Sequence, residues 1–145
     1  MSQAAKPMPV VDHLSAPYWE GCRNGRLLVQ TCGRCAKPRF PPAPVCQGCG
    51  YPDCEWIESS GRARVYSWIV VRHPIPAEIY GDEVPYVVAL VELAEGIRMP
   101  TNIVGCAPEA VAADMDVEVS FRDVGNGIHL PQFQPVALRT PEPRR

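Results

Sequence analysis

Residues 32–50, CGRCAKPRFPPAPVCQGCG, decide the fold of the N-terminal part of this 145-residue chain. Cys32 and Cys35 form one Cys-x-x-Cys pair, and Cys46 and Cys49 form a second pair after a proline-rich spacer. Each pair supplies two thiolates from one tight turn, so two such turns provide the four corners of a tetrahedral metal site. The spacing therefore predicts a zinc ribbon with a structural zinc ion, and iron in a rubredoxin-like site is the alternative.

Three further cysteines lie outside these pairs. Cys54 follows the second pair closely and could replace one ligand, although packing beside the site is the preferred interpretation. Cys22 and Cys106 lie in apolar patterns that are typical of small buried residues. We expect a metal site and not a disulfide framework, because nothing in the first residues resembles a signal peptide and disulfides are rare in the cytoplasm.

The composition describes an ordinary globular protein, with 46% hydrophobic and 21% charged residues. The net charge is −2 and the pI is about 5.9, which argues against a nucleic-acid partner, because such proteins are usually strongly basic. No apolar run approaches the length of a membrane span. We therefore expect a cytoplasmic protein with neither a nucleic-acid nor a membrane partner.

The pattern divides the chain into an arm and helix (residues 1–25), a zinc ribbon (26–58) and a β domain with a tail (59–145). Ser15 is the expected N-cap of the helix, and Gly25 is its expected end. The helix places Tyr18 and Cys22 on one face. That face either docks on the rest of the protein or receives a partner.

Five segments after Gly61 read as strands, because they are rich in β-branched and aromatic residues or alternate between apolar and polar positions. They cover residues 64–71, 85–93, 97–106 (broken near Pro100), 117–121 and 128–138, with a short helix expected at 108–113. Five strands with a helix between the third and fourth are typical of an OB-fold barrel. The fold class is therefore mainly β. The expected core residues are Val65, Ile69, Val88, Leu90, Val117 and Phe121.

The three histidines, His13, His73 and His129, show no local pairing with a serine or a carboxylate that would indicate a nucleophile arrangement. The chain also lacks a glycine-rich phosphate loop and a dinucleotide fingerprint. We therefore expect no autonomous catalytic set.

A second hypothesis for function is a single-stranded nucleic-acid-binding module, since a zinc ribbon and an OB barrel could offer stacking aromatic residues and a basic groove. The candidates for such a role are Tyr66, Trp68, Arg62, Arg64 and Arg72. Tyr66 and Trp68 are also expected on one strand face, where they could be core residues. The acidic balance of the chain argues against this hypothesis.

A succession of motifs between Tyr18 and Val136 resembles one protein family. The motifs are Tyr18-Trp19, CGRC, FPPAPVCQGCG, WIESSGRARVYSW, PYVVALVEL, TNIVGC, DVEVSF and LPQFQP. Together they resemble the zinc-ribbon and OB-fold proteins associated with acyl-CoA enzymes, long catalogued as a domain of unknown function. The resemblance implies an N-terminal helix, a rubredoxin-like ribbon with Cys32, Cys35, Cys46 and Cys49 as ligands, and a C-terminal OB fold. Asp114 stands where the family commonly has glycine.

The resemblance also implies a partner: a thiolase or a thiolase-like aldolase, acyltransferase or synthase, and in some relatives a hydratase. We expect a non-catalytic subunit in a hetero-oligomer that shares acyl-CoA with its partner. The loop of residues 72–85 would contact CoA or the partner through Arg72, His73 and Tyr80. Tyr18, Trp19, Ile75, Ile79 and Tyr80 are expected to be exposed for the partner, unless the helix and loop fold back on the barrel.

Overall fold

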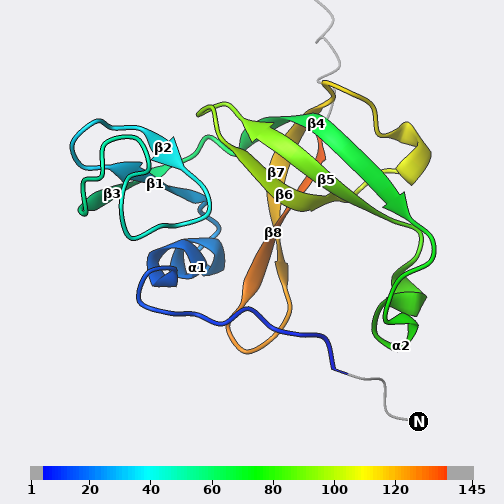
Figure 1. Ribbon diagram of the computed structural model, residues 1–145. Coiled ribbons are helices and arrows are strands. Elements are labelled where there is room, and N and C mark those ends of the chain that lie inside the picture. The colour runs from blue at the N-terminus through cyan, green and yellow to red at the C-terminus, as the bar shows by residue number, and fades with distance from the viewer. Residues whose placement is uncertain (1–4, 137–145) are drawn as a thin grey trace, which may run out of the picture.

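The computed structural model describes residues 5–136, so residues 1–4 of the expected arm and the tail from residue 137 lie outside the described part. Two β units lie side by side (Figure 1). The smaller unit is a sheet of β1 (Leu28–Cys32), β2 (Pro38–Arg39) and β3 (Cys54–Glu58), in the order β2-β1-β3. The larger is a closed barrel of β4 (Arg62–Val71), β5 (Tyr86–Leu93), β6 (Arg98–Ile103), β7 (Asp116–Asp123) and β8 (His129–Pro135), in the order β4-β5-β6-β8-β7. The expected ribbon and five-stranded barrel are both present.

The N-terminal helix α1 (Ala16–Arg23) lies under the ribbon and contacts β1 and β8. Gly25 ends the helix as expected, with a φ of 73°, and the Arg26 N–H donates to the Gly21 carbonyl at 2.8 Å. Ser15 is the N-cap residue as expected, but its hydroxyl makes no capping bond to the helix. It accepts the Asp12 N–H at 3.2 Å instead.

The helix face that carries Tyr18 and Cys22 docks on the rest of the protein. Tyr18 is 5% exposed, Cys22 is 0% exposed, and the ring of Tyr18 packs against that of Phe40 with centroids 5.7 Å apart. Both residues belong to one core cluster that continues into the barrel. Tyr18 is therefore a structural residue and is not exposed for a partner; Trp19 is also partly buried against this core.

The barrel closes where β6 meets β8 through the parallel pair Ile103 and Phe133, and Phe133 is fully buried there. At the other seam, β4 begins just after Gly61, whose φ is 77°. A Cβ at this position would lie 2.7 Å from Cγ1 of Val119, so both the conformation and the space require glycine.

Two local expectations in the barrel are corrected. Strand β6 runs through Pro100 without a break. Pro100 is exposed, and β6 pairs with β8 only at Ile103, so no residue of β8 requires an N–H group from Pro100. The expected helix at residues 108–113 is the short 3₁₀ turn η2 (Pro108–Ala110). Asp114 adopts a φ of 61°, a left-handed conformation that glycine enters most readily, which fits the glycine expected at this position from the resemblance.

A β-bulge in β4 changes which side chains face the core. The register with β5 shifts between Val65 and Ser67. Val65 is fully buried as expected, but Ile69 lies beyond the bulge and is 62% exposed, so its assignment to the core is wrong. The extra residue at the bulge reverses the alternation for the remainder of the strand.

The β5 residues expected in the core, Val88 and Leu90, lie on the outward face of the strand. Val87, Ala89 and Val91 are the buried residues of this strand, whereas Val88 and Leu90 are only half-buried and alternate with them. Successive strand residues point to opposite faces, so Val88 and Leu90 face outward. On β7, the expectation holds for Val117, which is fully buried, and Phe121 packs against the core while partly exposed.

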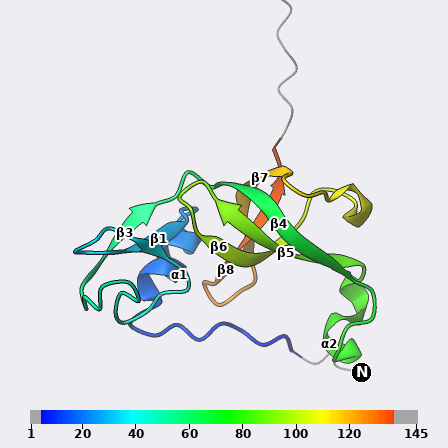
Figure 2. The same cartoon turned by 45° about the horizontal axis from the view of Figure 1, so that its top comes forward.

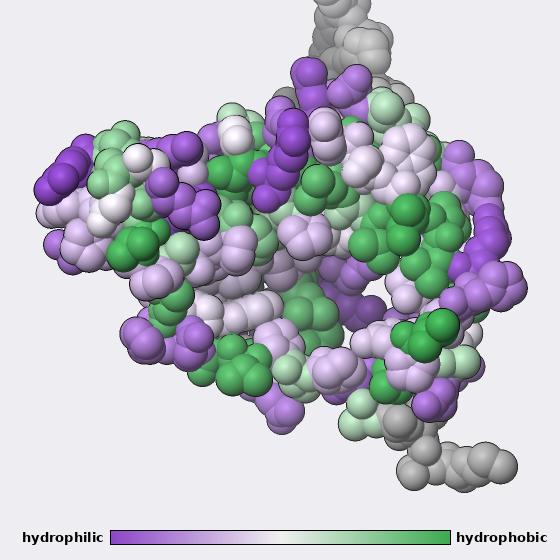
Figure 3. Space-filling view, viewed as in Figure 1, coloured by the Kyte–Doolittle hydropathy of each residue, from purple (hydrophilic) through white to green (hydrophobic). Residues whose placement is uncertain are grey.

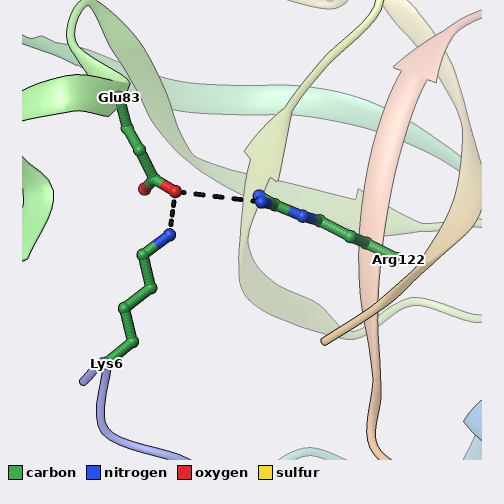
Figure 4. A network of polar contacts seen from close by, with 3 residues as sticks. All are labelled: Lys6, Glu83 and Arg122. Carbon is green, nitrogen blue, oxygen red and sulfur yellow. Dashed lines mark hydrogen bonds and ion pairs between the residues drawn. The ribbon is translucent and has the colours of Figure 1, made fainter. Parts of the chain in front are cut away.

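The loop between β4 and β5 contains α2 (Ala77–Tyr80) and η1 (Gly81–Glu83), which lie beside the barrel away from the ribbon (Figure 2). The described part of the arm runs below the barrel toward this loop (Figures 1 and 2). Figure 4 shows the contact: the Glu83 carboxylate forms an ion pair with the Lys6 ammonium of the arm and lies 3.8 Å from the Arg122 guanidinium of β7. Three separate segments therefore meet at one carboxylate.

Among the described residues, no helix combines the length and apolar character that a membrane crossing needs.

Candidate metal centre

The four predicted cysteine ligands come together at one end of the ribbon. Their Sγ atoms all lie within 4.8 Å of one another. The Sγ atoms of Cys32 and Cys49 are 3.5 Å apart, and those of Cys35 and Cys46 are 3.7 Å apart. Four thiolates around tetrahedral zinc stand roughly 3.8 Å apart for Zn–S bonds of about 2.3 Å. The donor set and its spacing fit a structural zinc ion.

Backbone N–H groups lie beside two of the four sulfur atoms and favour their ionised form. The N–H groups of Cys35 and Arg34 each lie 3.4 Å from the Cys32 Sγ, and with the Cys35 N–H as the largest cause they lower the pKa of Cys32 to about 6. The N–H of Cys49 likewise lowers the pKa of Cys46. Thiolate is the form that binds metal, so these turns favour the metal-binding form of Cys32 and Cys46. Although the Tyr51 N–H lowers it, the pKa of Cys49 is raised to about 11 by its neighbouring thiols.

The two knuckle loops contain almost no apolar core of their own. Between residues 33 and 53, Cys46 is the one buried side chain. Backbone bonds shape the second knuckle: the Gly50 N–H donates to the Cys46 carbonyl at 2.8 Å, and the Cys46 N–H donates to the Tyr51 carbonyl at 2.9 Å. A metal ion would therefore be the main connection between the two loops.

The other three cysteines lie outside the group of four. Cys54 pairs with Cys32 across the β1–β3 ladder, and the Gln30 amide donates to its Sγ at 3.2 Å, so it packs beside the site as preferred. Cys22 is fully buried, and burial raises the pKa of its thiol to about 12. Cys106 is partly buried against the barrel core.

The three residues expected to contact CoA or the partner lie on or next to the β4–β5 loop. Arg72 follows β4 directly, and its guanidinium forms an ion pair with Glu109 of η2 at 3.1 Å. His73 is exposed, and Tyr80 is half-buried at the end of α2. All three residues belong to the segment between β4 and β5, but the ion pair with Glu109 holds the Arg72 side chain toward η2.

The three histidines lie on separate segments of the described chain. His13 is in the arm, His73 is in the β4–β5 loop, and His129 begins β8. The Nε2 atom of His129 lies 3.9 Å from a carboxylate oxygen of Asp123, which is a neighbour across the β7–β8 ladder.

The residues considered for nucleic-acid stacking do not form a shared platform. Tyr66 is 52% exposed, but the Arg98 guanidinium lies 3.8 Å from the centre of its ring. Trp68 packs against the core, on the opposite side of the bulge, so the expectation that it shares a face with Tyr66 is wrong. Arg64 lies 3.4 Å from Asp116.

A rubredoxin-like zinc ribbon followed by an OB barrel defines the class of this protein. Two family models match the chain: "ChsH2, rubredoxin-like zinc ribbon domain" over residues 19–54, and "ChsH2, C-terminal OB-fold domain" over residues 56–122. The chain belongs to the ChsH2/DUF35 family. This confirms the resemblance inferred from the sequence motifs.

Curated relatives fall into two kinds. The chain is 40% identical to a probable enoyl-CoA hydratase alpha subunit of Thermomonospora curvata over 92% of its own length, but spans only 41% of that protein. It is 38% identical to a "DUF35 domain-containing scaffold protein" of Methanocaldococcus jannaschii, covering 78% of this chain and 80% of the relative. A "3-oxo-4,17-pregnadiene-20-carboxyl-CoA hydratase alpha subunit" of Mycobacterium tuberculosis is 36% identical over 75% of this chain and 34% of that protein.

Two solved structures share the fold. A chain of a structure described as "Ltp2-ChsH2(DUF35) aldolase" superposes with a TM-score of 0.79 at 40% identity, covering 88% of this chain and 98% of that one. A DUF35-family protein of unknown function from Sulfolobus solfataricus superposes with a TM-score of 0.60 at 12% identity, covering 86% of each chain, which supports the fold alone.

Proposed function

We propose that this chain is a non-catalytic, zinc-containing subunit of a thiolase-fold complex that acts on acyl-CoA thioesters in the cytoplasm. It would stabilise the partner enzyme in a hetero-oligomer and shape the acyl-CoA site. The observation that carries the proposal is the match to the Ltp2-ChsH2(DUF35) aldolase structure, because it covers 98% of the matched chain at 40% identity. The hydratase alpha subunits among the relatives support a thioester substrate class.

The placement of titratable groups supports assigning the bond-breaking chemistry to the partner. A nucleophile needs a base within hydrogen-bond reach. Within the described residues, the three histidines lie on separate segments, and the cluster of ionisable thiols has the geometry of a closed metal site. In this proposal the partner supplies the nucleophile and the bases for Claisen or retro-Claisen cleavage.

The β4–β5 loop is the segment proposed to reach the shared acyl-CoA site. Arg72 would exchange the Glu109 carboxylate for a CoA phosphate, since both are anions that a guanidinium can bind in a bidentate manner. His73 and Tyr80 would line the same approach from the loop.

Co-expression tests the proposal. The chain should form a stable complex with a thiolase-fold subunit from the same organism, measured by size-exclusion chromatography with light scattering. The partner alone should be poorly soluble or poorly active on its thioester, and this chain alone should release no CoA. Activity should return when the two purified proteins are mixed.

The purified chain also tests the alternative hypothesis, that the protein binds single-stranded nucleic acid. A labelled single-stranded oligonucleotide that binds the chain, and is released as salt rises, would support that alternative. A thiolase-fold partner that is fully soluble and fully active without this chain would defeat the proposed function.

A further inference from the structure

The outer face of strands β4, β5 and β6 is apolar although it faces away from the barrel core. Beyond the bulge, Ile69 pairs with Val88, and on the neighbouring rung Leu90 pairs with Pro100. Ile69 is 62% exposed, and its neighbours on this face are half-buried or exposed. We call this surface the outer β-face. Its apolar residues are Ile69, Val71, Tyr86, Val88, Leu90 and Pro100, and the polar Ser67 and Asn102 lie among them as partners of Leu90 and Val88.

This pattern is unusual for a barrel strand that faces water. Antiparallel strands normally alternate between a buried apolar face and a polar solvated face, whereas strands covered on both sides are apolar throughout. From Trp68 to Leu90, both faces of the β4–β5 pair carry mainly apolar side chains. Figure 3 shows the apolar colour gathering over the outer ends of these strands, where no other described segment covers it.

The outer β-face continues into the β4–β5 loop. Ile75, in that loop, is 94% exposed, and Figure 3 shows a second apolar area over the α2 region on the same side of the molecule. Exposed apolar areas rimmed by polar residues mark protein interaction sites. The face and the loop thus present two neighbouring apolar areas on one side of the molecule, and the loop is the segment already proposed to reach the shared acyl-CoA site.

We propose that the outer β-face is the docking surface for the thiolase-fold partner subunit; this inference rests on the proposed function. On the same face, Arg98 of β6 is already paired with Glu92 of β5 at 3.0 Å. The face therefore suits an uncharged, apolar patch on a folded protein better than an anionic ligand. Seating the partner here also holds the adjoining loop against it.

The test introduces a charge into the centre of the face. Ile69→Lys should leave the fold and zinc content unchanged, because the side chain points to solvent in the isolated chain. It should weaken association with the co-expressed thiolase-fold subunit on the order of 30-fold or more, as expected for a hot-spot position. Ile57→Lys is the matched control, since Ile57 is 40% exposed on β3 of the ribbon and should bind like the unchanged chain. Affinities are measured by titration calorimetry or biolayer interferometry.

Ile69→Ser is the second variant, in case the lysine disturbs folding. Normal binding by folded, zinc-loaded Ile69→Lys would overturn the docking surface while leaving the proposed function standing. Failure of the unchanged chain to bind the subunit would overturn both. The oligomeric state of the isolated chain is measured by analytical ultracentrifugation. If the chain forms a dimer that Ile69→Lys dissociates, and partner binding is unaffected, then the outer β-face binds a second copy of this chain and the proposal is rejected.

Discussion

Replacing Cys46 with serine should unfold the knuckle loops and leave the barrel folded. Cys46 is one of the four sulfurs that lie within 4.8 Å of one another, and it is also the one buried side chain between residues 33 and 53. Full burial of one apolar side chain contributes at most about 3 kcal/mol. Structural zinc contributes on the order of 10 kcal/mol in comparable small sites. Metal binding, and not hydrophobic burial, therefore determines whether these loops are ordered.

The barrel should survive because its stabilising contacts are separate from the knuckles. Phe133, Val65 and Val117 are fully buried within the barrel, whereas among residues 33–53 only Cys46 is buried and only Phe40 packs partly buried against the core. Elemental analysis should give one zinc per unchanged chain and none for Cys46→Ser. Hydrogen exchange should become fast in residues 33–53 and remain slow in β5.

Cys54→Ser is the matched control, because it makes the same chemical change next to the site but outside the group of ligands. It should keep one zinc and normal protection of the loops. The reasoning would be refuted if Cys46→Ser retained stoichiometric zinc, or if it lost zinc and its loops stayed protected. Loss of zinc in Cys54→Ser would show that the ligand set is wrong.

Two further outcomes test the barrel and the arm. Phe133→Ala should lower the free energy of unfolding by about 3–5 kcal/mol in a denaturant titration, because it leaves a cavity where β6 meets β8, while zinc content stays normal. Glu83→Gln should change the free energy of unfolding by less than about 1 kcal/mol, since its ion pairs with Lys6 and Arg122 are partly exposed. It should nevertheless speed hydrogen exchange in η1, and unchanged exchange there would show that the arm does not hold the loop.

The zinc ribbon could be predicted almost completely from sequence because its chemistry is local. Cys32, Cys35, Cys46 and Cys49 are recognisable by spacing alone, and the structure brings their sulfurs together as expected. The order and number of barrel strands were also accessible, since runs of β-branched and aromatic residues mark each strand. The position of the N-cap at Ser15 was also predictable, but its side-chain bond was not: the hydroxyl accepts the Asp12 N–H, three residues upstream, because a helix cap and a turn compete for the same side chain.

The core residues of β5, and those of β4 beyond the bulge, could not be assigned from the sequence, and the reason bears on function. Ile69, Val88 and Leu90 are as apolar as true core residues, but the bulge after Val65 turns Ile69 outward, and the buried side of β5 is the one that carries Val87. The hydrophobic effect rewards removal of apolar surface from water, whichever chain covers it. A pattern of apolar residues thus identifies positions that are buried in the working assembly. In a strand with two apolar faces, the fold of the single chain accounts for one face, and a partner that covers the outer β-face would account for the other.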